Sequence, residues 1–160
     1  MVFITLGSQK FQFDRLLEAV DRLLESGVLQ EEVFAQTGCS TYVPRHYKSR
    51  PFLDREEFAA ITAEADLVIT HGGTGAIIGA VKKGKKVIAV PRLARYGEHV
   101  DDHQLQIIDQ FEDLDLICAC RDCDRLEQAL DYVRSHTFQS YRSNTQTIVD
   151  AIDRYLTENL

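Results

Sequence analysis

Short runs of apolar residues alternate along the chain with longer segments in which apolar residues recur every three or four positions. The short runs predict buried strands, and the periodic segments predict helices with one apolar face. We expect strands at residues 1–6, 33–36, 67–70, 86–90 and 114–119, and a short strand near Tyr47 in the otherwise irregular stretch 37–51. We expect helices at residues 13–26, 54–65, 75–83, 101–111, 124–135 and 140–158.

Residues at the ends of these segments support the predicted boundaries. Asp54 stands at a helix start with Glu57 three positions later, which is the capping-box spacing, and Gly27 and Gly84 follow predicted helix ends. Strands and helices alternate throughout, as in parallel sheets covered by helices on both faces. Without any internal repeat, low-complexity segment or linker, we expect residues 1–160 to form a single Rossmann-like α/β domain.

Composition narrows the classes of function. The 160 residues are 44% hydrophobic and 27% charged, which fits one globular domain with its own core. The formal net charge of −7 argues against nucleic acid as a partner. No run approaches the roughly 18 apolar residues that span a bilayer. Residues 1–7 read as a strand and turn rather than a signal peptide, so we expect a cytoplasmic protein.

Four cysteines raise the question of a metal site. Cys39, Cys118, Cys120 and Cys123 do not form the two separated pairs typical of structural zinc. Cys118 and Cys120 lie two positions apart on a predicted strand and therefore face the same side. We expect reduced thiols at buried or strand-end positions, with zinc binding as the minor alternative.

Three segments follow predicted strands directly and would meet at the carboxyl edge of the sheet, where such folds bind ligands: residues 7–10, 71–75 and 91–104. The second segment, from His71 to Gly75, has three glycines and opens a helix. Glycines let backbone amides approach a ligand closely, and a helix N-terminus favours an anion. A plain tight turn would explain only one glycine, so this segment indicates a phosphate or diphosphate site.

Two other phosphate-binding motifs fit poorly. In the dinucleotide pattern, the third glycine is replaced by Ile78, the motif follows a late strand, and no acidic residue stands about 20 positions further on. The sequence also lacks the G-x-x-x-x-G-K-[ST] pattern of nucleoside triphosphatases.

Several of these segments together resemble the carboxyl-terminal domain of family 28 glycosyltransferases, which is the C-terminal half of a GT-B enzyme. The segments are residues 4–8, 13–16, 69–76, Gly84, 87–91 and 102–105, and the resemblance covers residues 1–119. The loop at 91–104 looks most like the PssE-like subunits of capsule and exopolysaccharide synthesis. Those subunits are similar to the cytosolic half of the split UDP-N-acetylglucosamine transferase.

The resemblance implies a function. Such enzymes have two Rossmann-like domains and hold the nucleotide-sugar donor mainly in the second, and the early first strand implies that only the second is present. We therefore expect a donor-binding catalytic subunit that transfers a hexosyl unit, with inversion, from a UDP-sugar to a lipid-linked glycan. It would need no metal or other cofactor. A membrane-associated partner subunit would supply the acceptor side and recruit the chain to the inner face of the membrane.

The resemblance also implies donor-binding residues. These are Gly7, Ser8, Phe52, Leu53, His71, Gly72, Gly73, Thr74, Gly75, Glu98, His103 and Gln104. Gly7, Ser8 and the glycine loop would hold the diphosphate. The Phe52–Leu53 pair would hold the uracil, and His103 and Gln104 would bind the sugar hydroxyls. Core packing explains the Phe52–Leu53 pair equally well. For any of the polar loop residues from Glu98 to Asp102, the alternative to a donor contact is a solvated surface charge.

One position departs from the family pattern. Gly79 stands where the family commonly has a glutamate that binds the ribose, so the loop around Glu98 would have to bind it. By residue type the general base could be His71, His99, Asp101 or Asp102. His71 could equally pin the turn, and we favour a base on the partner chain.

The last predicted helix carries Ile148, Ile152, Tyr155 and Leu156 on one side. This face either crosses to the partner or packs on the domain's own sheet. A non-catalytic regulatory subunit that binds nucleotide sugars is the alternative function. A stand-alone UDP-sugar epimerase or hydrolase is disfavoured, because a single domain leaves the cleft without a second wall. The sequence leaves galactose, glucuronic acid and N-acetylglucosamine open as the donor sugar.

Overall fold

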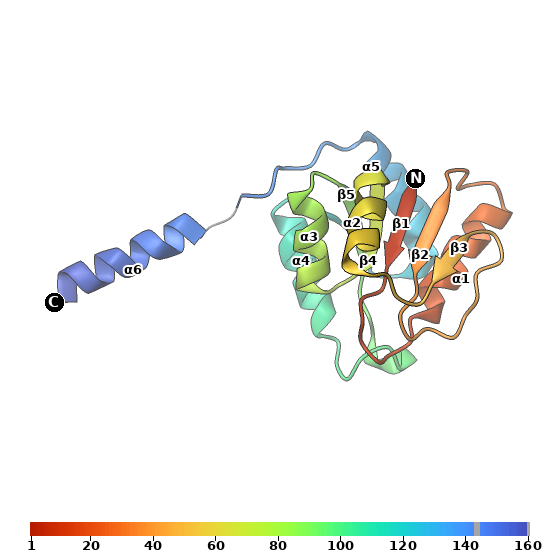
Figure 1. Cartoon of the computed structure of the whole chain (residues 1–160), viewed down its shortest axis with the longest axis horizontal. Coiled ribbons are helices and arrows are strands. Elements are labelled where there is room, and N and C mark those ends of the chain that lie inside the picture. The colour runs from red at the N-terminus through yellow and green to blue at the C-terminus, as the bar shows by residue number, and fades with distance from the viewer. Residues whose placement is uncertain (143–144, 160) are drawn as a thin grey trace.

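A computed structural model describes residues 1–142 and 145–159 of the chain (Figure 1). Its strands are β1 (Val2–Thr5), β2 (Val33–Gln36), β3 (Lys48–Arg50), β4 (Leu67–His71), β5 (Lys86–Val90) and β6 (Cys118–Ala119). Its helices are α1 (Asp14–Glu25), α2 (Arg55–Glu64), α3 (Thr74–Lys82), α4 (His103–Asp113), α5 (Leu126–Ser135) and α6 (Thr145–Asn159), and 3₁₀ turns lie at Ala94–Tyr96 and Cys123–Arg125.

All six strands are parallel and form one sheet in the order β3-β2-β1-β4-β5-β6. From β1 the chain builds outward to β2 and β3 and then returns to place β4 on the other side of β1. The strand order therefore reverses between β1 and β4, and the carboxyl ends of these two strands flank the crevice where such sheets bind ligands. The predicted Rossmann-like α/β fold is confirmed.

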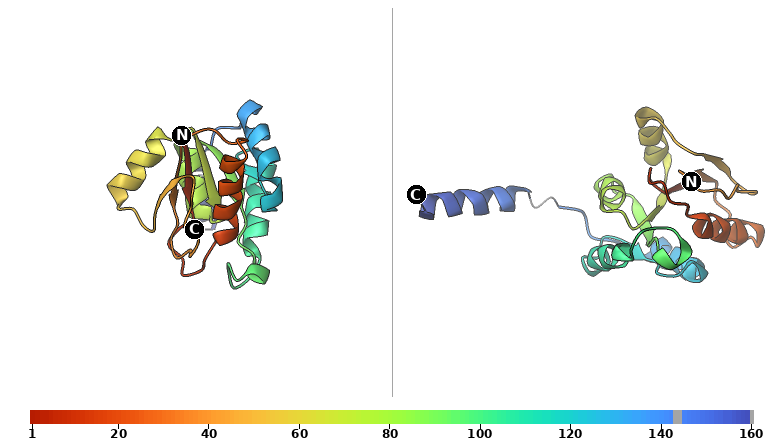
Figure 2. Two further views of the ribbon diagram at one scale, coloured as in Figure 1. Left: turned by 90° about the vertical axis from the view of Figure 1, so that its right-hand side faces the viewer. Right: turned by 90° about the horizontal axis from the view of Figure 1, so that it is seen from below.

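Two hydrophobic clusters hold the layers together. One lies between the sheet and helices α1 and α5, and the other between the opposite face and helices α2, α3 and α4. Figure 2 (left) shows α1 and α2 on opposite sides of the sheet. Neighbouring residues of a strand face opposite clusters, as Phe3 and Ile4 do, so the central strands are apolar on both faces.

The predicted elements are present, with the largest differences after α4 and at the start of α6. The capping box of α2 forms, because Glu57 N donates to Asp54 Oδ1 at 2.8 Å and Asp54 N donates to Glu57 Oε2 at 3.1 Å. The strand predicted at 114–119 is wrong for its first half: the amides of residues 114–116 donate to carbonyls in the last turn of α4. Asp115 takes a left-handed conformation with φ of 55° and closes the helix, so β6 begins only at Cys118.

Helix α6 begins at Thr145 rather than at residue 140, and the side chains that the structure describes in it do not pack on the sheet. Val149, Ile152 and Leu156 are exposed, and the helix extends away from the layered body in Figure 1. The side chain of Ile148 lies outside the described residues. Of the two predicted arrangements for this helix, packing on the domain's own sheet is therefore not found. Within the described ranges, no helix combines the length and the apolar character needed to cross a bilayer.

Three of the four cysteines are buried free thiols, and Cys39 is exposed in the loop after β2. Burial raises the pKa of Cys118 and Cys123 to about 11 and that of Cys120 to about 12. These thiols are therefore protonated at neutral pH and pack as small apolar groups. The part of the chain described by the structure contains no cluster of three or more metal-binding side chains.

The irregular segment 37–47 is fixed to α1 by the buried carboxylate of Asp21. Tyr42 Oη donates to Asp21 Oδ2 at 2.6 Å, and the backbone amides of Arg45 and His46 donate to the two carboxylate oxygens at 2.8 and 2.9 Å. Burial alone raises the pKa of Asp21, but these hydrogen bonds outweigh it and hold the pKa below the usual 3.8.

We expect Asp21→Asn to lower the free energy of unfolding by about 2 kcal/mol at pH 7, because charge-assisted hydrogen bonds are lost. A depressed carboxyl pKa contributes stability above the pKa of the unfolded state, and this is lost as the pH falls through the folded-state value. Urea unfolding should therefore show the gap between wild type and variant shrinking as the pH falls below 3.8. Asp131→Asn, which removes an exposed partner of Arg134, is the control, and a pH-independent gap for Asp21→Asn would refute the prediction.

Candidate functional site

The three segments expected at the carboxyl edge of the sheet do meet there. Residues 7–10 follow β1, residues 71–75 lie between β4 and α3, and residues 91–102 connect β5 to α4. Since β1, β4 and β5 are consecutive in the sheet, the three loops are neighbours around the reversal of strand order (Figure 1). The prediction from the strand pattern that these loops converge is confirmed.

His71, the last residue of β4, lies beneath the first two loops and is buried. A Cβ atom added to Gly7 would lie 2.8 Å from His71 Nε2, and one added to Gly73 would lie 2.2 Å from His71 Cε1. Gly7 also has a φ of +72°, which favours glycine. The imidazole thus fills the space between the two loops, and the glycines at 7 and 73 are needed for this packing.

Burial keeps His71 neutral. Desolvation, with smaller electrostatic contributions from Arg92 and His99, lowers the pKa of His71 to about 4. Gln104 Nε2 lies 3.3 Å from His71 Nδ1. We assign the hydrogen bond with the amide as donor, so that Nδ1 accepts and the proton is on Nε2, the atom nearest Gly7. His71 is therefore a neutral side chain that holds the turn by packing beneath it. This is the structural one of the two roles considered for it, the other being the general base.

Gln104 joins the glycine loop to the loop after β5. Its Oε1 accepts from Gly72 N at 2.9 Å and from Arg92 N at 3.0 Å, and the side chain is buried. A contact with donor sugar hydroxyls was expected for this residue, but its polar atoms are directed inward, so we reassign it to positioning the loops. The same contact occupies the amide of Gly72, which is therefore not free to bind a phosphate.

The remaining amides of the glycine loop lie at the open edge. Gly73 is the N-cap of α3 without a side-chain cap, and Thr74 and Gly75 are exposed. The first amides of a helix lack intrahelical acceptors and carry the positive end of the helix dipole. A Cβ atom added to Gly75 would meet nothing within 4 Å, so the space above this turn is open. This geometry fits the anion site predicted for the turn, and the exposed side chain of Ser8 belongs to the neighbouring loop after β1.

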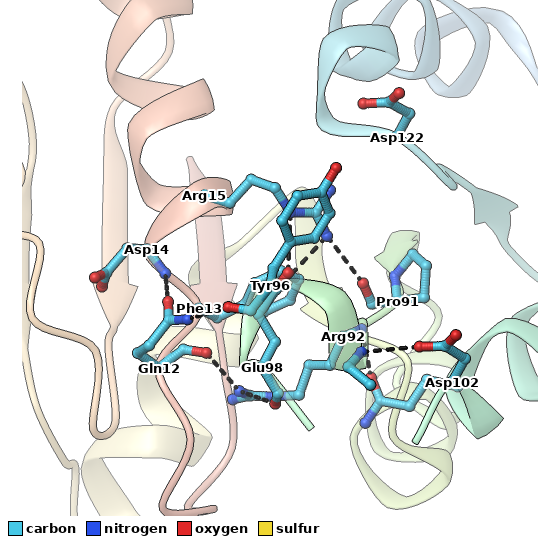
Figure 3. Close-up of polar contacts among 12 residues, drawn as sticks. Gln12, Phe13, Asp14, Arg15, Pro91, Arg92, Tyr96, Glu98, Asp102 and Asp122 are labelled. Carbon is cyan, nitrogen blue, oxygen red and sulfur yellow. Dashed lines mark hydrogen bonds and ion pairs between the residues drawn. The ribbon is translucent and has the colours of Figure 1, made fainter. Parts of the chain in front are cut away.

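Glu98 is paired inside the protein rather than exposed on its loop. Its carboxylate is fully buried and forms two hydrogen bonds with Arg15, from Nε at 3.0 Å and from Nη2 at 3.3 Å (Figure 3). Although burial lowers the pKa of Arg15, the hydrogen bond to Glu98 raises it above its usual value, as expected for a close ion pair. The ring of Tyr96 covers the guanidinium of Arg15 at 4.6 Å. The carboxylate of Glu98 is therefore occupied by Arg15, and ribose binding by the rest of this loop stays a prediction.

Among the residues whose burial the structure describes, Arg92 is the largest fully buried side chain, and it directly follows Pro91 at the end of β5. Its guanidinium donates to backbone carbonyls of both the loop after β1 and its own loop (Figure 3). Neither Arg92 nor Arg15 was identified from the sequence. The available signal was that Arg92 is a charged residue flanked by Pro91 and Leu93, directly after the apolar run of residues 87–90 in β5.

The polar residues of the third loop lie on the rim and contact one another. His99 Nδ1 lies 3.2 Å from Asp101 Oδ1, and Asp101 Oδ1 also accepts from the backbone amide of His103. Asp102 Oδ1 accepts from Ala94 N at 2.8 Å, and the exposed His103 ring contacts Gln106 at 3.1 Å. His99, Asp101 and His103 therefore lie on the loop between β5 and α4 at the carboxyl edge of the sheet, and their roles toward a donor stay predictions.

The Phe52–Leu53 pair, expected at the uracil, lies just before α2. Leu53 packs against the core cluster beside α2, whereas Phe52 is half-exposed. A cavity of about 140 Å³ separates α2 from α3 and is lined in part by Gly75, Ala76 and Gly79. The glycine at position 79 leaves open space where the family commonly has a glutamate.

Comparison with known sequences identifies a family and curated relatives. The profile of the glycosyltransferase family 28 C-terminal domain matches residues 1–155. The UDP-N-acetylglucosamine transferase subunit ALG13 of Mus musculus is 26% identical over 133 residues, which is 74% of this chain and 11% of that protein. The Homo sapiens protein of the same name is 30% identical over 131 residues, 75% of this chain and 11% of that protein. The Kluyveromyces lactis protein is 38% identical over 72 residues, 44% of this chain and 34% of that protein.

Solved structures share the fold. The crystal structure of Acinetobacter baumannii MurG matches with a TM-score of 0.58 and 21% identity over 94% of this chain and 49% of that chain. The NMR structure of ALG13 matches with a TM-score of 0.57 and 17% identity over 94% of this chain and 93% of that chain. At this identity, these similarities establish the architecture alone.

Proposed function

The chain belongs to the glycosyltransferase family 28 C-terminal domain family, and we propose that it binds the UDP-sugar donor in a two-component inverting glycosyltransferase. The observation that carries this proposal is the exposed first turn of α3, with amides at Thr74 and Gly75, beside the Gly7–Ser8 turn. Both lie at the reversal of strand order, where doubly wound sheets bind their ligands. A diphosphate fits such a site better than any uncharged group.

In the proposed reaction, an acceptor hydroxyl attacks the anomeric carbon of the donor sugar from the face opposite the UDP. The bond between that carbon and the diphosphate oxygen breaks, and UDP leaves with the negative charge that the bond electrons carry. Amides and a helix dipole that already point at the diphosphate stabilise this charge without reorganisation. We propose that the protein groups suffice for this step and that no metal takes part.

The general base belongs, in our proposal, to the partner. His71 is buried beneath the loop, with its pKa lowered to about 4, and is a poor proton acceptor at neutral pH. His99, Asp101 and Asp102 lie on the rim, where they would face a second subunit closing over the donor. Their place favours roles in binding the sugar or the partner.

The partner we propose is a membrane-associated subunit that binds a lipid-linked glycan acceptor in capsule or exopolysaccharide synthesis. The curated relatives are named as subunits of a UDP-N-acetylglucosamine transferase, which supports a second chain and makes N-acetylglucosamine the first sugar to test. The exposed aliphatic side chains of α6 offer a contact surface for that chain. Through this contact a cytoplasmic donor subunit would be held at the inner face of the membrane.

Titration of the purified chain with uridine, UDP and a panel of UDP-sugars tests the proposal. Because the proposed site binds the diphosphate, we expect UDP to bind at least about tenfold more tightly than uridine, equivalent to about 1.4 kcal/mol. We expect sugar transfer only when the partner subunit and its acceptor are present. Equal affinity for uridine and UDP would exclude the diphosphate site. UDP-sugar binding with transfer that survives removal of this chain would favour the regulatory alternative.

A further inference from the structure

The guanidinium of Arg92 bridges two of the three loops at the donor edge. Its Nη2 donates to the carbonyl of Leu6, which precedes the Gly7 turn. Its Nη1 lies 3.1 Å from Phe11 O, 3.2 Å from Gln12 O and 3.3 Å from Glu98 O. One planar cation therefore binds carbonyls from both ends of the loop after β1 and from the loop after β5, and Figure 3 shows its position beside Gln12 and Glu98.

The backbone amide of Arg92 extends this connection to the glycine loop between β4 and α3. Arg92 N donates to Gln104 Oε1, and the same oxygen accepts from Gly72 N in the glycine loop. The ends of β1, β4 and β5 are thus tied together through a single residue and the amide side chain it contacts. A rigid unit of this kind fixes the positions of the Gly7 turn and the first turn of α3 relative to each other.

The cluster around Arg92 also holds an excess of positive charge. Arg15 and Glu98 form an ion pair, and Arg15 Nη2 donates to Pro91 O at 3.2 Å. The Arg92 guanidinium donates to backbone carbonyls and lies 5.1 Å from the centre of the Phe13 ring, and no ion pair with a carboxylate is found for it among the described residues. Burying such a charge is costly, and carbonyl dipoles offset only part of the cost.

We propose that Arg92 is a positioning residue of the diphosphate site: it holds the Gly7 turn and the glycine loop in register and adds positive potential beneath them. This inference rests on the proposed function. It gives the buried charge a counterion, namely the diphosphate of the donor. The effect of the charge reaches the site, because Arg92 is one of the groups that lower the pKa of His71, which lies between Gly7 and Gly73.

Two variants separate the geometric contribution from the charge. Arg92→Lys keeps the charge and loses the planar fork, whereas Arg92→Met keeps much of the length and loses both. Arg134→Lys is the matched control, because Arg134 pairs with Glu31 at the surface, on the helix that follows β6. For each chain we would measure the dissociation constants of UDP and uridine, and the hydrogen exchange of the amides in residues 6–13 and 91–98.

We expect Arg92→Lys to weaken UDP binding about tenfold and Arg92→Met about 100-fold, with uridine binding changed by less than about twofold in both. The amides of residues 6–13 should lose protection in both variants, and the Arg134→Lys chain should match wild type. If either folded variant binds UDP as tightly as wild type, or loses uridine and UDP affinity equally, the inference is wrong.

The failure of this inference is distinguishable from failure of the proposed function. If the wild-type chain does not prefer UDP to uridine, the donor-binding proposal fails, while the exchange data still decide whether Arg92 holds the loops. If Arg92→Met does not fold, Arg92→Lys carries the test, since it changes no charge.

Discussion

Gly73→Ala is expected to reduce UDP-sugar affinity by at least about 100-fold, because the new methyl group has no space. A Cβ atom at this position would lie 2.2 Å from His71 Cε1 and 2.9 Å from His71 Nδ1. His71 cannot retreat, since it also lies against Gly7 and contacts Gln104. The loop must therefore move, and the amides that bind the diphosphate move with it. Isothermal titration with a UDP-sugar and thermal unfolding would measure both consequences.

Two further glycines of α3 make this experiment specific. Gly75→Ala meets no protein atom within 4 Å, so we expect normal stability but weaker donor binding, because the methyl group enters the open space over the helix end. Gly79→Ala also meets nothing within 4 Å and should leave donor affinity within about twofold of wild type while stabilising the helix by up to about 1 kcal/mol. If all three variants bind alike, the proposed position of the diphosphate is wrong.

The sequence was sufficient to predict the layered fold and the convergence of the three loops. Both depend on local signals: strand and helix periodicity, and a capping box in which Asp54 and Glu57 lie only three positions apart. The order of elements then determines which strand ends become neighbours, because parallel strands end at the same edge. This is why the glycine loop could be assigned to the site before its contacts were known.

The sequence was not sufficient to predict which polar residues of the site point inward. Glu98 pairs with Arg15 across 83 positions, and Gln104 contacts His71 across 33. Pairing at such separations depends on how loops cross in space, which no local pattern encodes. The family resemblance implies that Glu98 and Gln104 bind the donor, whereas in the structure their side chains connect the loops to each other and to α1. The short strand β6 was over-predicted for a related reason, because apolar residues 116 and 117 look alike in a strand and in the turn that closes α4.

Combined replacement of Ile152 and Leu156 by aspartate is expected to abolish partner-dependent sugar transfer while leaving the donor site intact. Both side chains are about half-exposed on α6, which does not pack on the sheet, so the substitutions should not change the thermal unfolding of the domain. Each aliphatic side chain buried at an interface contributes about 1.5–3 kcal/mol. Losing two of them should weaken association with the partner at least about 100-fold.

Arg154→Ala, an exposed position of the same helix, is the matched control and should retain transfer. Association would be measured by co-purification and titration with the partner subunit, and UDP binding by the chain alone. If the double variant still binds its partner, α6 is not the contact between the two chains. If the double variant instead loses UDP affinity, α6 packs against the donor site of its own chain. The aliphatic face would then cover the sheet and not a second protein. If the double variant keeps its UDP affinity but loses transfer, donor binding and association with the partner are separate. The strand ends would then bind the donor, and α6 would bind the partner.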